Sequence, residues 1–443
     1  MTQRLNVEQL KTQIQHCGGF RTAGRLASAQ GVLTASVSAA IGELCYIFGG
    51  TGRPVLAEVV GFTDGFSQLM PLQPTPEVTA GATVVTLNRP MRVPVGDGLK
   101  GRVLDALGHP IDQRGPTFFD AWIPLQKESP NPMTRLPISE PLVTGQKALD
   151  GLLTIGKGQR VGLFAGSGVG KSTLLGEIAR HAVSDVNVVV LVGERGREVR
   201  PFIADCLGPQ GLKRSIVIVS TAEQPPLLRI RSVQTGLAIA DWYRNQGKHV
   251  FFMLDSLTRL AWSQRELGLS IGEPPSSRGF TPSSIQILAK LIEQLGTSDR
   301  GAISAMLTIL VDGDDTSEPV ADAARSMLDG HVVLDRKLAE RGHFPAINLA
   351  ASVSRVARQI TSKAQQEQSL NVRDLLGEYS EVEDLIRIGA YQTGTSPQID
   401  RAIQMKPMID QFLRQAPGQF VPWNQTLQEL KQICESSSGQ LAS

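Results

Sequence analysis

The sequence predicts an α/β protein in which a central domain built on a parallel sheet stands between a small β-barrel and a group of helices. Three observations predict this arrangement. Short β-rich segments follow one another between residues 20 and 87, strands alternate with helices between 145 and 335, and the chain beyond 355 is polar and helical. Strand–helix alternation is typical of a parallel sheet covered on both faces. We expect three domains, at residues 1–92, 93–362 and 363–443.

The composition is that of an ordinary folded protein and argues against several functional classes. Of 443 residues, 41% are hydrophobic and 19% are charged, which is typical of a globular protein of several domains. A net charge of +2 and an aromatic content of 5% predict no nucleic-acid partner, because such partners need basic patches or stacking aromatics. The four cysteines are scattered without a CxxC pair or zinc spacing, so we expect reduced thiols in a cytoplasmic protein.

The N-terminal part predicts one short helix followed by a barrel. Residues 1–18 are polar, with a few apolar side chains on one helical face, and they indicate no secretory signal. After them, Gly, Pro and Asp separate short β-rich segments, and strands at this spacing are typical of a small closed barrel. These segments are residues 31–37, 44–48, 55–62, 67–72 and 82–87.

A glycine-rich, hinge-like stretch from Gly96 to Gly108 leads toward the central domain. The strands expected there are residues 160–164, 187–192, 215–220, 249–254, 302–310 and 330–334. The helices expected between and after them include residues 226–245, 281–295, 370–388, 398–414 and 424–434.

A glycine-rich turn between the strand at 160–164 and a following helix predicts a phosphate-binding loop. Its backbone N–H groups and the positive end of the helix converge on phosphate oxygens. Lys171 reaches the β- and γ-phosphates, and the Ser172 hydroxyl ligates Mg²⁺. Alanine replaces the usual first glycine, which is acceptable where φ is negative. The turn consists of Ala165, Gly166, Ser167, Gly168, Val169, Gly170, Lys171, Ser172 and Thr173.

Two further strands end in charged residues, where open α/β sheets bind ligands. Asp255 ends one of them and occupies the usual place of a residue that holds Mg²⁺ through water; its alternative role is a helix cap. Glu194 and Arg195 end the other, where Glu194 can polarise an attacking water and Arg195 can sense phosphates. The alternative for this pair is a solvated charge cluster that starts a helix.

Several motifs together resemble the rotary ATPase alpha/beta superfamily, over residues from about 25 to 415. They are Gly193–Glu198, Leu254–Arg259, Gly272–Phe280 and His343–Arg355. The resemblance implies a RecA-like P-loop domain at the centre of the chain. Residues 265–275, 311–322 and 328–334 look like the flagellar and type III secretion export ATPases in particular, and residues 59–72 and 397–415 look flagellar.

This resemblance implies a role for each matching residue. Lys171 and Ser172 match the phosphate lysine and the magnesium hydroxyl. Glu194 matches the catalytic glutamate, Asp255 the acid of the second nucleotide motif, and Arg355 an arginine finger offered to a neighbouring subunit. The remaining matches are Arg195 and Glu198 beside the glutamate, Arg259 after the acid, Phe344 against adenine, and Tyr391 as a second adenine contact.

The resemblance also implies a function: a Mg²⁺-dependent ATP hydrolase that forms a homo-oligomeric ring, most simply a hexamer, and energises flagellar protein export. It implies a peripheral place on the cytoplasmic face of the inner membrane. The implied partners are a stator-like regulator, a central stalk protein, export-gate membrane proteins, and cargo with its chaperones. Leu349 departs from the superfamily signature, and the acidic lever motif of ATP-synthase catalytic subunits is absent.

Three alternatives remain open. The first is the ATPase of a virulence type III secretion system. The second is an RNA-translocating motor of the transcription-terminator type, against which the scarcity of basic and aromatic residues in the barrel argues. The third is a ring subunit that binds nucleotide without hydrolysis, against which Lys171, Glu194 and Asp255 argue.

Overall fold

The computed structural model describes residues 21–28, 32–49, 53–73, 78–125, 127–311 and 318–438. These residues form two compact units. One contains the described residues up to Arg92 together with Leu267–Glu273, and the other contains Val93–Glu266 and the described residues from Pro274 onward. The helix predicted at residues 1–18 lies outside the described residues.

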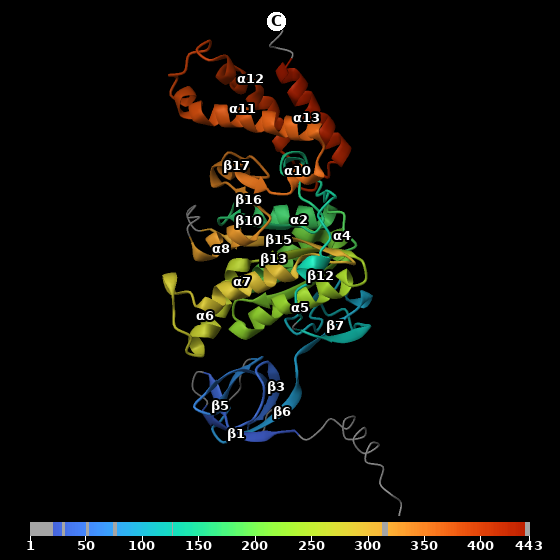
Figure 1. Cartoon of the computed structure of the whole chain (residues 1–443), viewed down its shortest axis with the longest axis vertical. Helices are drawn as coiled ribbons and strands as arrows, with labels where there is room; N and C mark the ends of the chain where they lie inside the picture. Colours follow the sequence, from blue (N-terminus) through green and yellow to red (C-terminus); the bar gives the residue numbers. More distant parts are fainter. Residues whose placement is uncertain are drawn as a thin grey trace, which may run out of the picture. The chain divides into compact units, whose positions relative to one another are not determined.

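The first unit contains the predicted barrel, drawn in blue in Figure 1. Its strands pair antiparallel and close in the order β1-β2-β5-β4-β3-β6. Buried apolar side chains such as Ile47, Val59, Leu69 and Val84 alternate with more exposed neighbours and fill the interior, as the pleat of a barrel requires. The strands are β1 (Ala23–Ser28), β2 (Leu33–Ala35), β3 (Glu43–Phe48), β4 (Val55–Thr63), β5 (Phe66–Pro71) and β6 (Thr83–Pro90).

The second unit is organised on a nine-stranded sheet in the order β17-β16-β10-β15-β13-β11-β12-β8, with β14 paired to β15. All six predicted strands are present and parallel, and all nine residues of β11 are buried, as expected for a strand covered on both faces. They are β10 (Arg160–Ala165), β11 (Val186–Glu194), β12 (Ser215–Thr221), β13 (His249–Asp255), β15 (Ala302–Leu310) and β16 (Gly330–Leu334).

Three short or edge strands that the sequence did not predict complete this sheet. The stretch expected to be a hinge contributes β8 (Val103–Leu104), which pairs parallel to β12. At the other edge, β17 (Ile347–Ser354) pairs antiparallel to β16, and β14 (Gly296–Thr297) pairs antiparallel to β15, so the sheet is mixed. A separate two-stranded ribbon consists of β7 (Arg92–Val95) and β9 (Ala121–Pro124).

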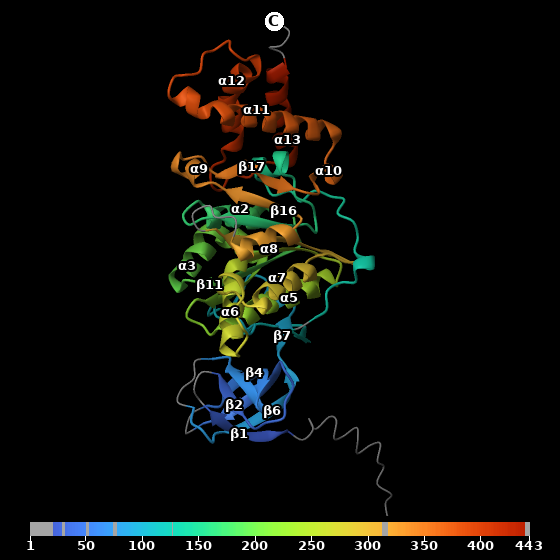
Figure 2. The ribbon, with the colours of Figure 1, turned by 60° about the vertical axis from the view of Figure 1, so that its left-hand side comes forward.

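Helices flank the sheet on both sides in the two ribbon views (Figures 1 and 2). Helix α5 packs on β11, β12 and β13, which accounts for its large number of buried residues. The helices are α2 (Lys171–His181), α3 (Gly196–Pro201), α4 (Gly208–Lys213), α5 (Pro226–Arg244), α6 (Leu257–Ser270), α7 (Pro282–Gln294), α8 (Pro319–Met327), α9 (Arg336–Glu340) and α10 (Ala357–Ile360). The described residues also form two π-helical turns, η3 (Ala148–Leu152) and η4 (Phe202–Leu207), and three short 3-10 turns, η1 (Asp97–Leu99), η2 (Pro132–Thr134) and η5 (Ser277–Gly279).

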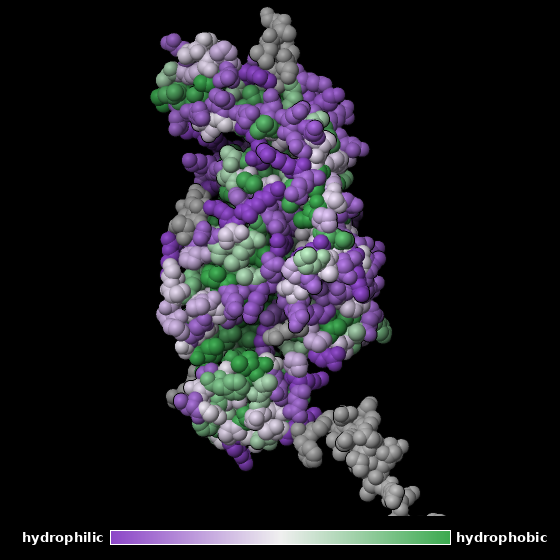
Figure 3. All heavy atoms as spheres, in the orientation of Figure 1, coloured by the Kyte–Doolittle hydropathy of each residue, from purple (hydrophilic) through white to green (hydrophobic). Residues whose placement is uncertain are grey.

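Three helices end the described chain: α11 (Lys363–Arg387), α12 (Pro397–Leu413) and α13 (Trp423–Ser438). Helix α11 begins earlier than predicted, because Ser362 caps it by accepting a hydrogen bond from the Gln365 N–H. Buried side chains of these helices belong to the same apolar core as the sheet. Their outer surface is mostly hydrophilic in Figure 3, with a hydrophobic area where α11 leads toward α12, and exposed Leu385 and Ile388 belong to that segment.

Within the described ranges, no helix combines the length and the apolar character that crossing a membrane requires.

The surroundings of two helical glycines, Gly176 and Gly377, predict opposite effects of a glycine-to-alanine substitution on the stability of the protein. A Cβ on Gly176 in α2 would lie 2.5 Å from the Cys206 carbonyl oxygen, whereas a Cβ on Gly377 in α11 meets nothing within 4 Å. We expect Gly377→Ala to stabilise the protein by up to about 1 kcal/mol, because alanine is the better helix former. We expect Gly176→Ala to destabilise it by about 1–3 kcal/mol through overpacking. Thermal unfolding measures both, and a Gly176→Ala protein at least as stable as wild type contradicts the close approach.

Candidate active site

The predicted glycine-rich turn connects β10 to α2. Ala165 is the last residue of β10 and has extended backbone, which explains why alanine is accepted at the first position. Gly168 and Gly170 have φ angles of 78° and 89°, in the left-handed region that favours glycine. Helix α2 begins at Lys171, so the exposed Ser172 lies in its first turn. The turn and the helix N-terminus therefore have the form of an anion-binding loop.

Lys171 lies beside Asp255, the carboxylate predicted at the end of β13. Its Nζ is 2.6 Å from Oδ1 of Asp255, and the hydroxyl of Thr308 in β15 donates to the same oxygen at 2.8 Å. Strand β15 lies between β10 and β13, so the carboxyl ends of three neighbouring strands bring these groups together. Oδ2 of the buried Asp255 receives no hydrogen bond from a described residue, and this oxygen is available to a ligand.

Glu194 is buried at the end of β11, the strand next to β13. The guanidinium of Arg259, in α6, contacts its carboxylate. Burial, and secondarily the negative charge of Asp255, raises the pKa of Glu194 to about 7, although the charges of Arg259 and Lys171 oppose this shift. A carboxylate with a pKa near neutrality beside an anion-binding loop is suited to accept a proton from water.

Arg195 and Glu198 lie on the outside of this cluster. The Arg195 guanidinium is 67% exposed and pairs with Glu198 at 3.4 Å, within the start of α3. The sequence placed both residues beside Glu194, and they are its close neighbours in the chain. Their side chains contact each other, and Glu198 also shares a hydrogen bond with Glu194, whose buried carboxylate is contacted by Arg259.

A cavity of about 300 Å³ opens next to the glycine-rich turn. Phe344 forms one wall, and a Cβ on Gly170 would lie 3.5 Å from its ring, so the predicted aromatic does lie against the turn. The Phe344–Pro345 and Asp255–Ser256 peptide bonds are cis. The other walls are Val169, Leu174, Leu334, Pro345, Ala346, Ala416 and Pro417, and the polar groups come from Gln146, Thr173, Glu177 and Gln415.

Gln415 is a site residue that the sequence did not predict. Its backbone N–H donates to the Phe344 carbonyl at 2.9 Å, and its buried side-chain amide donates to Gly145 and Gln419 carbonyls at 2.7 and 2.6 Å. Its Oε1 accepts from the Lys147 N–H at 3.0 Å. The connection between α12 and α13 is thereby fixed to the wall of the cavity. Only the tertiary fold could identify Gln415, since its partners are up to 270 positions away.

Two predicted residues lie away from this cavity. Tyr391 is in the connection between α11 and α12, where its hydroxyl donates to Asp400 at 2.9 Å, and it does not line the cavity. Arg355 directly follows β17, whose last residue, Ser354, pairs with Gly330 at the start of β16. The glycine-rich turn follows the end of β10, so Arg355 and Lys171 lie at opposite ends of the strands, separated by the length of β10, which is about 17 Å at roughly 3.3 Å per residue.

Comparison with known proteins shows similarity over nearly the whole chain. Residues 145–354 match the ATP synthase alpha/beta family, nucleotide-binding domain, and residues 361–432 match the T3SS EscN ATPase C-terminal domain. The chain is 47% identical over 415 residues to the flagellum-specific ATP synthase of Bacillus subtilis, and the aligned region covers 92% of this chain and 95% of the relative. It is 43% identical to the type 3 secretion system ATPase of Xanthomonas euvesicatoria, over 91% of each chain.

Solved structures agree with this similarity. The assembled ATPase EscN from the type III secretion system of enteropathogenic E. coli superposes with a TM-score of 0.87 at 37% identity, over 93% of this chain and 99% of that one. EscN in complex with its central stalk EscO superposes with a TM-score of 0.85 at 37% identity, over 93% of this chain and 99% of that chain.

The surroundings of Glu194 predict the direction in which its pKa moves when a neighbour is changed. Arg259→Gln removes a charge that lowers this pKa, so the titration should move above pH 7; Asp255→Asn removes a charge that raises it, so the titration should move below pH 7. The measurement is the infrared difference spectrum between each protein and its Glu194→Gln counterpart as a function of pH. A Glu194 carboxyl that titrates in the ordinary range near pH 4 contradicts the burial argument.

Proposed function

The chain belongs to the flagellum-specific and type 3 secretion ATPases of the ATP synthase alpha/beta family, and on this premise we propose that it hydrolyses Mg-ATP to energise flagellar protein export. The identity of 47% to a flagellar relative, against 43% to a secretion-system relative, favours the flagellar system. The ATPase of a virulence secretion system is the second candidate.

The observation that carries the proposal is the convergence of Lys171, Asp255 and Glu194 at the edge of the sheet where the glycine-rich turn begins. Here the turn cradles the phosphates and Lys171 exchanges Asp255 for the β- and γ-phosphate oxygens. Glu194 orients the attacking water and accepts its proton once Arg259 no longer holds the carboxylate. Arg195 and Glu198, at the exposed margin, support the glutamate.

The chemistry of this edge fits a magnesium ion that arrives with the nucleotide. The Ser172 hydroxyl and the free Oδ2 of Asp255 are hard oxygen donors that would hold this ion, with Asp255 acting through a water molecule. Among the described residues, no three or more His, Cys, Asp or Glu side chains cluster to hold a metal ion by themselves. When bound, the ion neutralises charge on the β- and γ-phosphate oxygens.

The apolar cavity beside the turn takes the adenine ring, with Phe344 as the stacking wall. Ala416 and Pro417 also line this cavity, whereas Tyr391 does not. The helices after residue 363 thus contribute to the nucleotide site through the α12–α13 connection. We therefore propose three domains, at residues 1–92, 93–362 and 363–443. The last of them is expected to respond to bound nucleotide through this connection.

Arg355 acts on the nucleotide of a neighbouring subunit, and the separation between Arg355 and Lys171 supports this role. A finger at the opposite edge of the sheet cannot reach the phosphates of its own chain, so each complete site needs two copies. The assembled EscN supports a homo-oligomer, which we propose is a hexamer, and its complex with EscO supports a central stalk partner. We propose a peripheral position at the cytoplasmic membrane face of the export apparatus.

Two substitutions separate binding from hydrolysis. Lys171→Ala should lower ATP turnover by on the order of 10²–10³-fold or more, because the phosphates lose their fixed cation. Glu194→Gln should keep Mg-ATP binding and lose about 10²–10⁴-fold in single-turnover rate, because an amide cannot accept the proton. Exposed Glu381→Gln, in α11, is the matched control and should behave as wild type. Hydrolysis at the wild-type rate by either site variant would refute its assigned role.

Mixing two inactive variants tests whether Arg355 acts in trans. Arg355→Ala should bind nucleotide normally and lose roughly 10³–10⁵-fold in turnover, as isolated arginine fingers do. When it is mixed with Lys171→Ala, interfaces that combine the intact loop of one copy with the intact finger of the other should regain activity. Size-exclusion chromatography must verify that mixed oligomers form. Mixed oligomers without recovered activity, or full activity from a monomer, exclude action in trans.

A further inference from the structure

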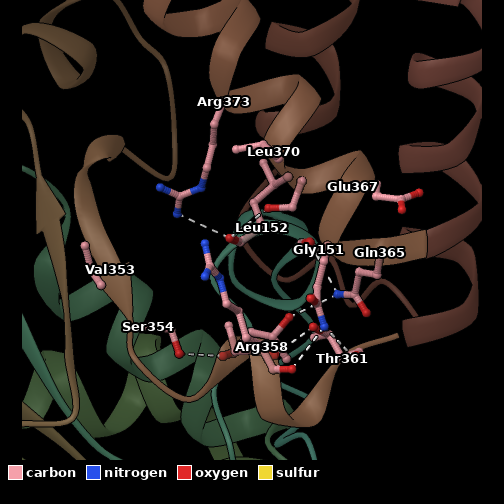
Figure 4. Close-up of a pocket in the computed structure, with 14 residues that line it drawn as sticks. Gly151, Leu152, Val353, Ser354, Arg358, Thr361, Gln365, Glu367, Leu370 and Arg373 are labelled. Carbon is pink, nitrogen blue, oxygen red and sulfur yellow. Dashed lines mark hydrogen bonds between the residues drawn. The ribbon is translucent and has the colours of Figure 1, made fainter. Parts of the chain in front are cut away.

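A second cavity, of about 480 Å³, lies at the edge of the sheet opposite to the glycine-rich turn. It is bounded by η3, by the end of β17 and by the first turns of α11 (Figure 4). Its volume is within the roughly 300–1,000 Å³ that small-molecule sites occupy. The proposed nucleotide site does not include this second cavity, because the residues that line the second cavity are all different from those that line the cavity beside Phe344.

Two arginine side chains converge in this cavity without a counter-ion. In Figure 4 the guanidinium groups of Arg358, from α10, and Arg373, from α11, point toward one another, and Glu367 points away from both. Within the described residues, neither arginine forms an ion pair, and the Arg358 guanidinium makes no hydrogen bond. Two like charges that approach each other repel, so the arrangement lacks the negative charge that would stabilise it.

Arg373 is partly buried and bonded only to neutral acceptors. Its two terminal nitrogens donate to the carbonyl oxygens of Leu349, Ser352 and Leu152 at 3.1 to 3.4 Å. Charge-assisted bonds from arginine to an anion are shorter, about 2.7–2.9 Å. The carbonyls orient this guanidinium without neutralising it, and burial lowers the pKa of Arg373. The carbonyls take up the N–H groups of both terminal nitrogens, so Arg373 acts in the cavity as a fixed positive charge.

Two further features indicate what the ligand is like. The first turn of α11, a helix of 25 residues, contributes Gln365 and Gln366 to the lining, and a helix N-terminus adds about half a positive charge. The exposed apolar side chains of Val353 and Leu370 also line the cavity. A lining that combines positive charge with apolar surface fits a small organic anion better than an inorganic ion.

We propose that this cavity binds a small organic molecule carrying a phosphoryl group, with Arg358 as the ligand of the phosphate oxygens and Arg373 as a second, fixed positive charge. Val353 and Ser354 line the cavity before Arg355 in the chain, and Ala357 and Arg358 line it after Arg355. A ligand here therefore lies against residues on both sides of Arg355 in the chain. The site stands on its own geometry and does not require the proposed ATPase function.

The test is calorimetric titration of the full chain with phenyl phosphate, which supplies a phosphoryl dianion on an apolar body. The chain carries Lys171→Ala so that the glycine-rich turn contributes little. We expect one saturable site that binds phenyl phosphate more tightly than inorganic phosphate. Adding Arg358→Gln should weaken binding by about tenfold to a hundredfold, the usual loss for one charge-assisted hydrogen bond. Arg358→Lys, which keeps the charge but not the fork, should restore part of the affinity.

The matched control is Arg300→Gln, which removes one charge from an exposed arginine whose side chain does not line the cavity. It should leave the affinity unchanged, and the thermal midpoints of all variants should agree. Equal weakening by Arg300→Gln and Arg358→Gln would mean non-specific attraction and overturn the proposal. The absence of saturable binding at millimolar phenyl phosphate would also overturn it. So would equal affinities for phenyl phosphate and inorganic phosphate, measured both with Arg358 and with Arg358→Gln.

Discussion

The ion pair between Lys171 and Asp255 is the interaction on which the candidate active site depends. The two residues are 84 positions apart, and their side chains meet only because β10, β15 and β13 end side by side. A buried charge without its partner is costly, and breaking such a pair typically costs about 3–5 kcal/mol. The same pair holds the lysine Nζ beside Asp255, next to the turn for which we propose phosphate binding.

A second pair of opposite charges, Glu194 and Arg259, lies at the end of the next strand, β11. Glu194 and Arg259 add one negative and one positive charge, so the four side chains are close to neutral together. Burial, and secondarily the negative charge of Asp255 at the end of the neighbouring strand, raises the pKa of Glu194 toward neutrality. The polyphosphate that we propose as substrate adds further negative charge, for which we propose that a metal ion arrives with it.

The antiparallel direction of β17 divides the remaining functional residues between the two edges of the sheet. Phe344 precedes this strand and lies at the edge with the glycine-rich turn, whereas Arg355 follows it and lies at the opposite edge. Both arginines of the second cavity belong to the helices that follow Arg355. A single strand therefore links the wall of one chain's nucleotide cavity to the group that we propose for its neighbour's site.

The sequence alone determined the features that depend on near neighbours in the chain. The barrel, the six parallel strands, the principal helices and the glycine-rich turn follow from hydrophobic periodicity and turn residues, which act over a few positions. The tertiary structure decided what depends on contacts between distant segments: the pairing of Glu194 with Arg259, the Gln415 contacts, the place of Tyr391 away from the cavity, and the convergence of Arg358 with Arg373. Such contacts depend on how whole elements pack against one another. No local pattern predicts them, because the alternation along a strand and the repeat of a helix relate only residues within the same element.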